Sequence, residues 1–463
     1  MTPRRPSPMR AMRGTLVFVL VVMAVVRGAI VLTSSDSDSD AYGHFAAARA
    51  MLALPERVTV HWVWLPGWHI VLALLIKLRV GFTGARLFNA ALAAVGPVVL
   101  YRAIRRHSVL AALSASLAWA VSPLSNLLAT SAQSETLFAL MLVCASTALA
   151  RRRGLAAGVA LMVACLLRYE AWAALFALAL ALANEMALGR GKNRRTPWPT
   201  VLAVGLGATA ILGWCGVRAS TDGRWFSFVH DTVGFVGGIP QGKGPLGLFT
   251  YTLIVPAKVL GPAFGLVLVG LPRAAKIAPE LARASLGILV FLTVTCLLGG
   301  SLGLDRHFAS IVPFACVAFG FGLVRVSTGW GRIGAVGLVV TLVVHLGWSV
   351  AATRSRSAPQ RAAAAWVEMN AGDTPIVCTD VALEVLTGLP ERKFLRSLPT
   401  TGPALIYGWE TQLGSLAEKG TPIGRWSQEG GDSVVVRRVT GEREPRGNTP
   451  AAPAASSPPS TTN

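Results

Sequence analysis

Long apolar runs alternate with short polar breaks along the first 351 residues. The runs cover approximately 14–33, 86–104, 108–128, 136–150, 154–168, 170–188, 199–217, 250–271, 284–303, 308–326 and 333–351. Most approach the ~20 residues that an α-helix needs to cross a bilayer. We therefore predict an all-α polytopic membrane domain over residues 14–351, with about 11 transmembrane helices.

One further apolar run, Leu65–Val80, is ambiguous. It is short, it opens with Pro66-Gly67, and it ends in Lys77 and Arg79. Lys and Arg are enriched in cytoplasmic loops. If this run does not cross, the basic clusters near residues 102–106, 151–153, 190–195, 273–283 and 325–332 all fall inside. We therefore predict that it lies in the outer interface, with residues 1–13 as a cytoplasmic tail and the C-terminus outside.

This topology places unusual polar residues on one side of the membrane. They are the acidic first outer loop (residues 34–85), Gln133-Ser134-Glu135, Arg168-Tyr169-Glu170 and Asp305-Arg306-His307. Charged residues at membrane depth are usually paired and functional. Their convergence predicts a functional site at the outer face.

The first outer loop carries the densest set of reactive side chains. Asp40 and Asp38 could act as a general base or a metal ligand, or could cap the helix expected at residues 41–54. Asp40 is the first choice because it adjoins that helix, and Asp36 is expected to be solvated. His44, His61 and Tyr42 follow in the same loop, and we regard them as candidate substrate contacts.

The remaining polar breaks each have a structural alternative. Glu135 could simply be a carboxylate at a helix start, where the helix dipole favours it. Arg168 could bind substrate or could pair structurally with Glu170. Arg306 and His307 form a charged lip that suits a phosphate group.

After residue 352 the composition becomes polar enough to fold in water. Residues 355–440 predict a small α/β domain, with helices at 360–370 and 381–387 and strands at 375–378, 404–409 and 433–439. Residues 441–463 are rich in Pro, Ala, Ser and Thr without an apolar period, which is typical of a disordered tail.

Composition excludes several other classes of protein. Hydrophobic residues make up 53% of the chain and charged residues 14%, too apolar a balance for a single soluble domain. The formal charge of +21 is then explained by cytoplasmic basic loops, so no nucleic-acid partner is expected. Among the six cysteines no CxxC or Cys/His spacing occurs, which argues against a zinc site or a disulfide framework.

Four short motifs share the predicted outer side and occur in a characteristic order. They are Asp38-Ser39-Asp40 with Ala48 and Met51, Trp64-Leu65-Pro66-Gly67, Pro123 through Ser134-Glu135-Thr136-Leu137-Phe138, and Asp305-Arg306-His307-Phe308 with Pro313. With these motifs the chain resembles the GT-C superfamily of integral-membrane glycosyltransferases. The branch that it resembles includes protein O-mannosyltransferases and lipid A aminoarabinose transferases.

This resemblance implies a GT-C-like fold over residues 14–351. It also implies that the protein is located in the cell membrane, which it crosses several times. Such enzymes pass a sugar from a polyprenyl-phosphate donor to an extracytoplasmic lipid, glycan or protein. By resemblance, Asp40 or Asp38 would be the base of an inverting reaction, and Arg168, Arg306 and His307 would face the lipid phosphate. Some relatives use a divalent cation such as Mg or Mn. The chain departs from the aminoarabinose-transferase pattern in having Glu135 where an Asp is usual.

A transporter or flippase of a lipid-linked or anionic substrate is the alternative. Such a protein would place broken helices and charges near the midplane, often in two similar halves. No internal duplication is present in this sequence.

Overall fold

The chain forms two compact units, Met1–Ala358 and Pro359–Asn463. The computed structural model describes residues 8–36, 38–53, 63–187, 197–227, 229–231, 246–261, 263–298, 304–326, 358–395, 397–399, 402–427 and 432–440, together with 344, 347 and 351. Three of our predictions lie largely or wholly outside these residues: His61 as a site residue, the span at 333–351 and the disordered tail at 441–463.

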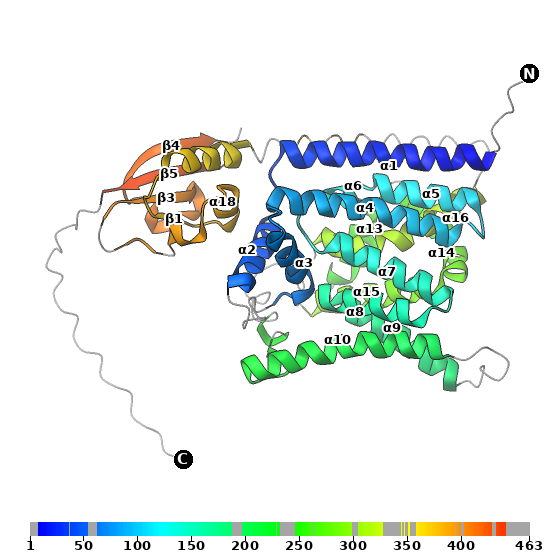
Figure 1. Cartoon of the computed structure of the whole chain (residues 1–463). Coiled ribbons are helices and arrows are strands. Elements are labelled where there is room, and N and C mark those ends of the chain that lie inside the picture. Colours follow the sequence, from blue (N-terminus) through cyan, green and yellow to red (C-terminus); the bar gives the residue numbers. More distant parts are fainter. Residues whose placement is uncertain are drawn as a thin grey trace, which may run out of the picture. The chain divides into compact units, whose positions relative to one another are not determined.

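The regular structure of the first unit is helical throughout its described residues, and Figure 1 shows these helices side by side in a bundle. The helices before the midpoint of the unit are α1 (Pro8–Thr33), α2 (Ser39–Ala53), α3 (Pro66–Lys77), α4 (Phe82–Ile104), α5 (Val109–Val121), α6 (Pro123–Ala129), α7 (Glu135–Ala150), α8 (Gly154–Leu167) and α9 (Glu170–Ala187). The later ones are α10 (Trp198–Asp222), α12 (Leu246–Phe249), η2 (Thr250–Ile254), α13 (Val255–Leu260), α14 (Ala263–Ile277), α15 (Pro279–Leu297), η3 (Asp305–Ser310) and α16 (Val312–Arg325).

Within the described residues, α1, α4, α9, α10 and α15 are each long and apolar enough to cross a membrane. Helices α3, α7, α8 and α16 are apolar but shorter. These helices follow the predicted runs closely because an apolar run bounded by polar breaks is a local property of the sequence. The short α3 occupies the ambiguous run, and its place at the interface stays a prediction.

Two of the apolar runs that we predicted as spans, 108–128 and 250–271, are bent sharply in the structure. Between α5 and α6 the axis bends by 54°, because Pro123 has no N–H to continue the helix that ends at Val121. Between Thr250–Leu260 and Ala263–Ile277 the axis bends by 117°. Gly261 lies at that bend with φ of 53°, a backbone conformation that favours glycine.

Small residues let the later helices approach closely. A Cβ at Gly270 of α14 would overlap the carbonyl oxygen of Ala318 in α16. The reverse holds at Gly322 of α16, where a Cβ would overlap the carbonyl oxygen of Leu266 in α14. Because apolar helices in lipid gain little from the hydrophobic effect, such close van der Waals contact is an important source of their association.

The second unit contains a five-stranded mixed sheet in the order β2-β1-β3-β5-β4. Strand β1 pairs in parallel with β2 and β3, whereas β5 pairs antiparallel with β3 and β4. Its strands are β1 (Ile376–Cys378), β2 (Phe394–Leu395), β3 (Ala404–Trp409), β4 (Thr421–Ser427) and β5 (Ser433–Val439). A helix at residues 358–370, α18 (Val381–Leu386) and the short 3-10 helices η4 (Glu391–Lys393), η5 (Glu410–Gln412) and η6 (Gly414–Leu416) complete the regular structure described there.

The small α/β fold predicted for the C-terminal part of the chain is confirmed by this sheet and its helices. Strands β1, β3 and β5 and both predicted helices lie where the sequence pattern placed them. The core includes Ile376, Leu405, Tyr407, Val434 and Val436, all at most 2% exposed. The two remaining strands were not predicted, because β2 is only two residues long and β4 is mostly exposed and contains Pro422.

Candidate functional site

Six charged side chains from distant parts of the sequence meet in one network. They are Asp38 before α2, Asp40 in its first turn, Glu135 at the start of α7, Arg168 between α8 and α9, Glu170 at the start of α9, and Arg306 in η3. All six lie in polar breaks from which the sequence predicted a site. The structure therefore brings together residues that are up to 268 positions apart.

Arg306 is shared by the two aspartates of the first loop. Its Nη1 donates to Asp38 Oδ2 at 2.8 Å, and its Nη2 donates to Asp40 Oδ2. The side chains are 19% exposed for Arg306, 34% for Asp38 and 33% for Asp40, so a ligand can reach all three. The fork of the guanidinium allows this double contact, which a lysine could not reproduce with the same geometry.

Arg168 is held by two glutamates that each begin a helix. Its Nη1 donates to Glu135 Oε1 at 2.6 Å, and its Nη2 donates to Glu170 Oε1 at 2.7 Å. Its Nε donates to both oxygens of Glu170 at 3.2 Å. Burial alone would lower the pKa of Arg168, but Glu170 and Glu135 raise it above its usual value, so the side chain stays charged.

Glu135 joins the two halves of the network. Arg306 Nε lies 4.0 Å from Glu135 Oε1, the oxygen that also accepts from Arg168. Burial would lower the pKa of Arg306, whereas Glu135, Asp38 and Asp40 raise it, so this side chain also stays charged. The network therefore holds four carboxylates around two guanidiniums, and Glu135 links the Arg306 half to the Arg168 half.

Asp38 also fills the structural role that we considered as an alternative. Its Oδ1 accepts the backbone N–H of Asp40 at 3.0 Å, and its backbone carbonyl accepts the N–H of Ala41. These are the contacts of a residue at a helix N-terminus. Asp38 therefore caps α2 and binds Arg306 at the same time, whereas the Asp40 carboxylate points to Arg306.

Asp36 is buried, so the expectation that it is solvated is wrong. It is 4% exposed, and its Oδ2 accepts the backbone N–H of Ala132 at 3.0 Å. Burial raises the pKa of the Asp36 carboxyl, and Arg86, whose Nε lies 3.8 Å away, acts in the opposite direction. Asp36 also accepts the backbone N–H of Asp38 at 3.3 Å, and together with Arg86 it holds the segment between α6 and α7.

Three further side chains bind the backbone of that segment, Thr130–Gln133. Arg86 Nε donates to the carbonyl of Thr130 at 2.7 Å, and Trp68 Nε1 donates to that of Ala132 at 2.8 Å. Asn89 Nδ2 donates to the carbonyls of Leu128, Ser131 and Gln133. Because these contacts fix the turn that precedes α7, they also fix the position of Glu135.

Sequence reasoning did not single out Arg86 and Asn89 as contributors to the site. Both are fully or nearly fully buried in α4, a helix that is otherwise largely apolar. The available signal was a pair of polar residues within an apolar run, because such residues are costly in a membrane unless they bind a partner.

The predicted candidates His44 and Tyr42 are buried on α2. His44 Nδ1 lies 3.0 Å from Nε2 of His69 in α3, and the ring of Trp64 lies 4.0 Å from the His44 ring. Tyr42 donates to the backbone carbonyl of Asp36 and accepts its N–H. These contacts join α2 to α3 and to the end of α1.

His307 lies beside the network and is partly buried. Its Nδ1 lies 3.1 Å from the hydroxyl of Tyr251, which also donates to the carbonyl of Leu304. Burial and the positive charge of Arg168 lower the pKa of His307 to about 3, although Glu170 acts against this. The imidazole is therefore neutral at physiological pH.

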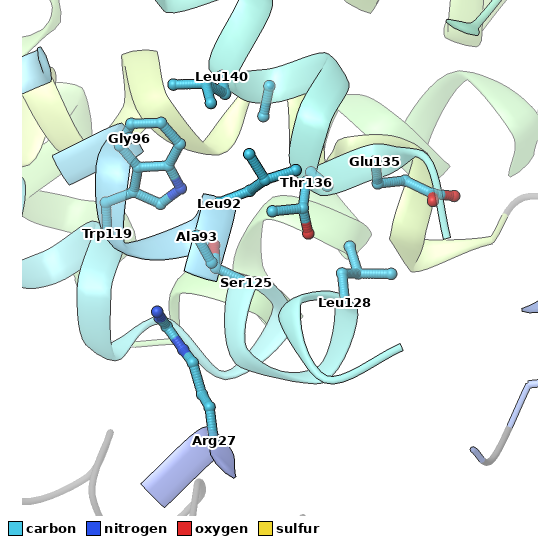
Figure 2. A pocket seen from close by; sticks show the side chains of 12 residues that line it. Arg27, Leu92, Ala93, Gly96, Trp119, Ser125, Leu128, Glu135, Thr136 and Leu140 are labelled. Carbon is cyan, nitrogen blue, oxygen red and sulfur yellow. The ribbon is translucent and has the colours of Figure 1, made fainter. Parts of the chain in front are cut away.

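A narrow pocket lies next to the network (Figure 2). It reaches from Arg27 of α1 to Glu135 of α7 and Ala309 of η3. Most of its wall is apolar and comes from α4, α5, α6 and α7.

The described residues do not form a metal site. No group of three or more His, Cys, Asp or Glu side chains among them is arranged to hold a metal ion. The nearest acidic cluster, Asp38 and Asp40, directs its carboxylates to Arg306 instead.

No protein-family model and no curated protein sequence matches this chain. A crystal structure of ArnT from Cupriavidus metallidurans bound to undecaprenyl phosphate superposes with a TM-score of 0.66 and 16% identity, over 91% of this chain and 98% of that one. The apo form of ArnT superposes with a TM-score of 0.64 and 17% identity, over 92% and 98%. ArnT is a lipid A aminoarabinose transferase of the GT-C superfamily. The chain therefore has the GT-C fold that its motifs predicted.

Proposed function

We propose that the chain is a membrane glycosyltransferase that moves a sugar from a polyprenyl-phosphate donor to an extracytoplasmic lipid, glycan or protein. The observation that carries this proposal is the double contact of Arg306 with Asp38 and Asp40. It places two candidate bases and a candidate phosphate-binding cation within reach of one another and of solvent. The GT-C fold and the undecaprenyl phosphate bound to ArnT support a lipid-phosphate donor.

In the proposed reaction Asp40 accepts the proton of the acceptor hydroxyl. The acceptor oxygen then bonds to the anomeric carbon while the bond from that carbon to the phosphate oxygen breaks. Attack from the face opposite the leaving group inverts the anomeric configuration. The lipid phosphate departs with the electron pair, and Arg306 neutralises its charge.

Asp40 is the preferred base and Asp38 the second choice. Asp38 already accepts the backbone N–H of Asp40 and would lose that helix cap if it turned toward an acceptor. Arg306 is the preferred phosphate ligand, because every nitrogen of Arg168 donates to a buried glutamate. Arg168 would then position Glu135 and Glu170.

The contacts of Arg306 with Asp38 and Asp40 bear on the order of events. A phosphate that binds Arg306 competes with the two aspartates for the same guanidinium. As the guanidinium turns to the phosphate, Asp40 gains freedom to accept a proton. Donor binding would therefore precede activation of the acceptor.

The test compares sugar transfer by membranes that contain wild-type protein, Asp40→Asn or Asp38→Asn. The donor is the radiolabelled lipid-linked sugar that accumulates in cells lacking the protein. We expect Asp40→Asn to lower the rate by about 100-fold or more, as is typical for loss of a general base, and Asp38→Asn to lower it less. Glu185→Gln, at an exposed ion pair with Arg283, is the matched control. Wild-type rates in both aspartate variants would overturn the assignment.

The proposed topology has its own test. It places the C-terminal unit outside the cytoplasm and the loop at Arg105 inside. An Arg105→Cys variant should react with a membrane-impermeant thiol reagent only after the membrane is opened. Labelling from outside intact cells, above the level of the parent protein, would contradict the shared outer face of the site.

A further inference from the structure

Arg27 is a buried cation whose partners are all neutral. The residue is 1% exposed in α1, its Nε donates to Asn126 Oδ1 at 2.7 Å, and its Nη2 donates to the carbonyl of Ala120 at 2.8 Å. Its Nη1 is buried and makes no hydrogen bond with the described residues. A buried charge is costly without an opposite charge nearby.

Part of this arrangement is structural. The break at Pro123 leaves the carbonyl of Ala120 without a helical partner, and Arg27 and Asn126 both donate to it. An uncharged donor could do the same. The helix break therefore explains why Arg27 Nη2 donates a hydrogen bond here. It does not explain why the side chain is charged, nor why its buried Nη1 lacks a hydrogen-bond partner.

No described acid forms an ion pair with Arg27, and Glu135, which lines the same pocket, is paired with Arg168. Each described acidic residue of the first unit lies within 4.0 Å of a basic residue other than Arg27. The pairs are Asp36–Arg86, Asp38–Arg306, Asp40–Arg306, Glu135–Arg168, Glu170–Arg168, Glu185–Arg283, Asp222–Arg218, Asp231–Arg218, Glu280–Arg283 and Asp305–Lys258. Outside the described residues, this unit contains one further acid, Glu56. A ligand is therefore the available source of negative charge.

The pocket beside Arg27 suits an anion that is attached to a hydrocarbon chain. Arg27 extends from α1 toward a wall formed largely by Leu92, Ala93, Trp119 and Leu128 (Figure 2). Helix α1 lies at the edge of the bundle in Figure 1 and exposes apolar side chains such as Phe18 and Val25. A lipid could thus approach from the membrane.

We propose that this pocket binds the terminal phosphate of a single-chain lipid, with Arg27 Nη1 donating to one anionic oxygen. A narrow pocket favours a phosphate at the end of one chain over the bulkier head group of a two-chain phospholipid. The identity of the lipid rests on the proposed function, in which polyprenyl phosphate is the departing product. Glu135 and Ala309 line this pocket and Arg306 is not among its lining residues, so the Arg27 end would hold a second molecule of that lipid.

The experiment measures lipid binding rather than sugar transfer. The full chain is placed in nanodiscs of phosphatidylcholine, and native mass spectrometry counts added polyprenyl phosphate. We expect two bound molecules on the wild type and one on Arg27→Gln, with affinity at this site weakened by about 10-fold or more, as for loss of a charge-assisted hydrogen bond. Neutral polyprenol should bind equally to both proteins.

An Arg306→Gln background separates this proposal from the proposed function. In the Arg306→Gln variant, the Arg27 site should still bind one polyprenyl phosphate. The double variant, with Arg306→Gln and Arg27→Gln together, should bind none. If Arg306→Gln has no effect on binding, the donor site is wrong while the Arg27 site stands. If Arg27→Gln binds like the wild type in this background, the Arg27 proposal is overturned.

Two further variants show whether a loss of lipid binding is caused by the loss of charge or by misfolding of the protein. Arg27→Lys keeps the charge and should retain binding, whereas Ser125→Asp adds a second acid to the pocket besides Glu135 and should abolish binding with Arg27 intact. Thermal unfolding of each variant reports the structural role separately. Equal competition by phosphatidylglycerol would show a head-group site instead, and competition by inorganic phosphate alone would show a free-anion site; either result overturns the proposal.

Discussion

Arg168 Nη1 lies 2.6 Å from Glu135 Oε1, across 33 residues of sequence, while the same guanidinium binds Glu170 two residues away. One arginine thereby ties the start of α7 to the start of α9. Both glutamates are nearly inaccessible to water, with side chains 3% and 7% exposed. An arginine in this position is needed for the fold as well as for the charge balance of the site.

Removal of Arg168 should therefore cost more stability than removal of either glutamate charge. Arg168→Met leaves two buried carboxylates without their cation, and breaking a buried pair typically costs about 3–5 kcal/mol. Glu135→Gln leaves Arg168 paired with Glu170 and should cost less. Thermal unfolding in detergent would compare the two, and a smaller loss for Arg168→Met would contradict this view.

Arg306→Lys should weaken the donor site although it keeps the positive charge. An ammonium group cannot bind Asp38 and Asp40 through two separate nitrogens in the geometry that Arg306 uses. We expect the donor KM to rise by about 10-fold, corresponding to one lost charge-assisted hydrogen bond. Steady-state kinetics would measure it, with Arg283→Lys at an exposed ion pair as the control.

His307 should make the protein less stable in acid. Its pKa is lowered from the usual 6.5 to about 3, chiefly by burial. Between these values the unfolded chain binds a proton that the folded chain does not, so stability falls as the pH drops below about 6.5. His307→Gln removes this titration, and its unfolding temperature should depend less on pH between 7 and 5. An unchanged pH dependence would show that His307 is not responsible.

Gly270→Ala should disrupt the contact between α14 and α16. The added methyl group would overlap the carbonyl of Ala318, and overpacking of this kind usually costs about 1–3 kcal/mol. Gly265 lies on the same helix and has open space at the Cβ position. Gly265→Ala is therefore the matched control and should be neutral or slightly stabilising in the same unfolding measurement.

The sequence was most informative where structure depends on neighbouring residues. Helices α7, α8 and α9 match predicted runs to within a residue or two at most ends, because apolar runs and polar breaks define them locally. The polar breaks also identified all six members of the charge network. The apolar runs supplied the all-α membrane fold class, and the short motifs supplied the resemblance to the GT-C superfamily.

The sequence did not allow us to predict which residues far apart along the chain contact one another. The burial of Asp36 depends on Ala132, which is 96 residues away, and the turn after α6 depends on Arg86 and Asn89 of α4. No local pattern encodes such pairs. The bends at Pro123 and Gly261 were visible as residues, but their angles follow from the packing around them.

The position of Arg306 in the sequence also bears on biosynthesis. Asp38, Asp40, Glu135 and Glu170 are all translated before it, and Arg168 is the cation of the network that precedes it. The two aspartates therefore acquire their cation only when most of the helical unit has left the ribosome. A nascent chain that stops before Arg306 would carry the acidic loop without its cation, so closure of the site would report that synthesis of the bundle is nearly complete.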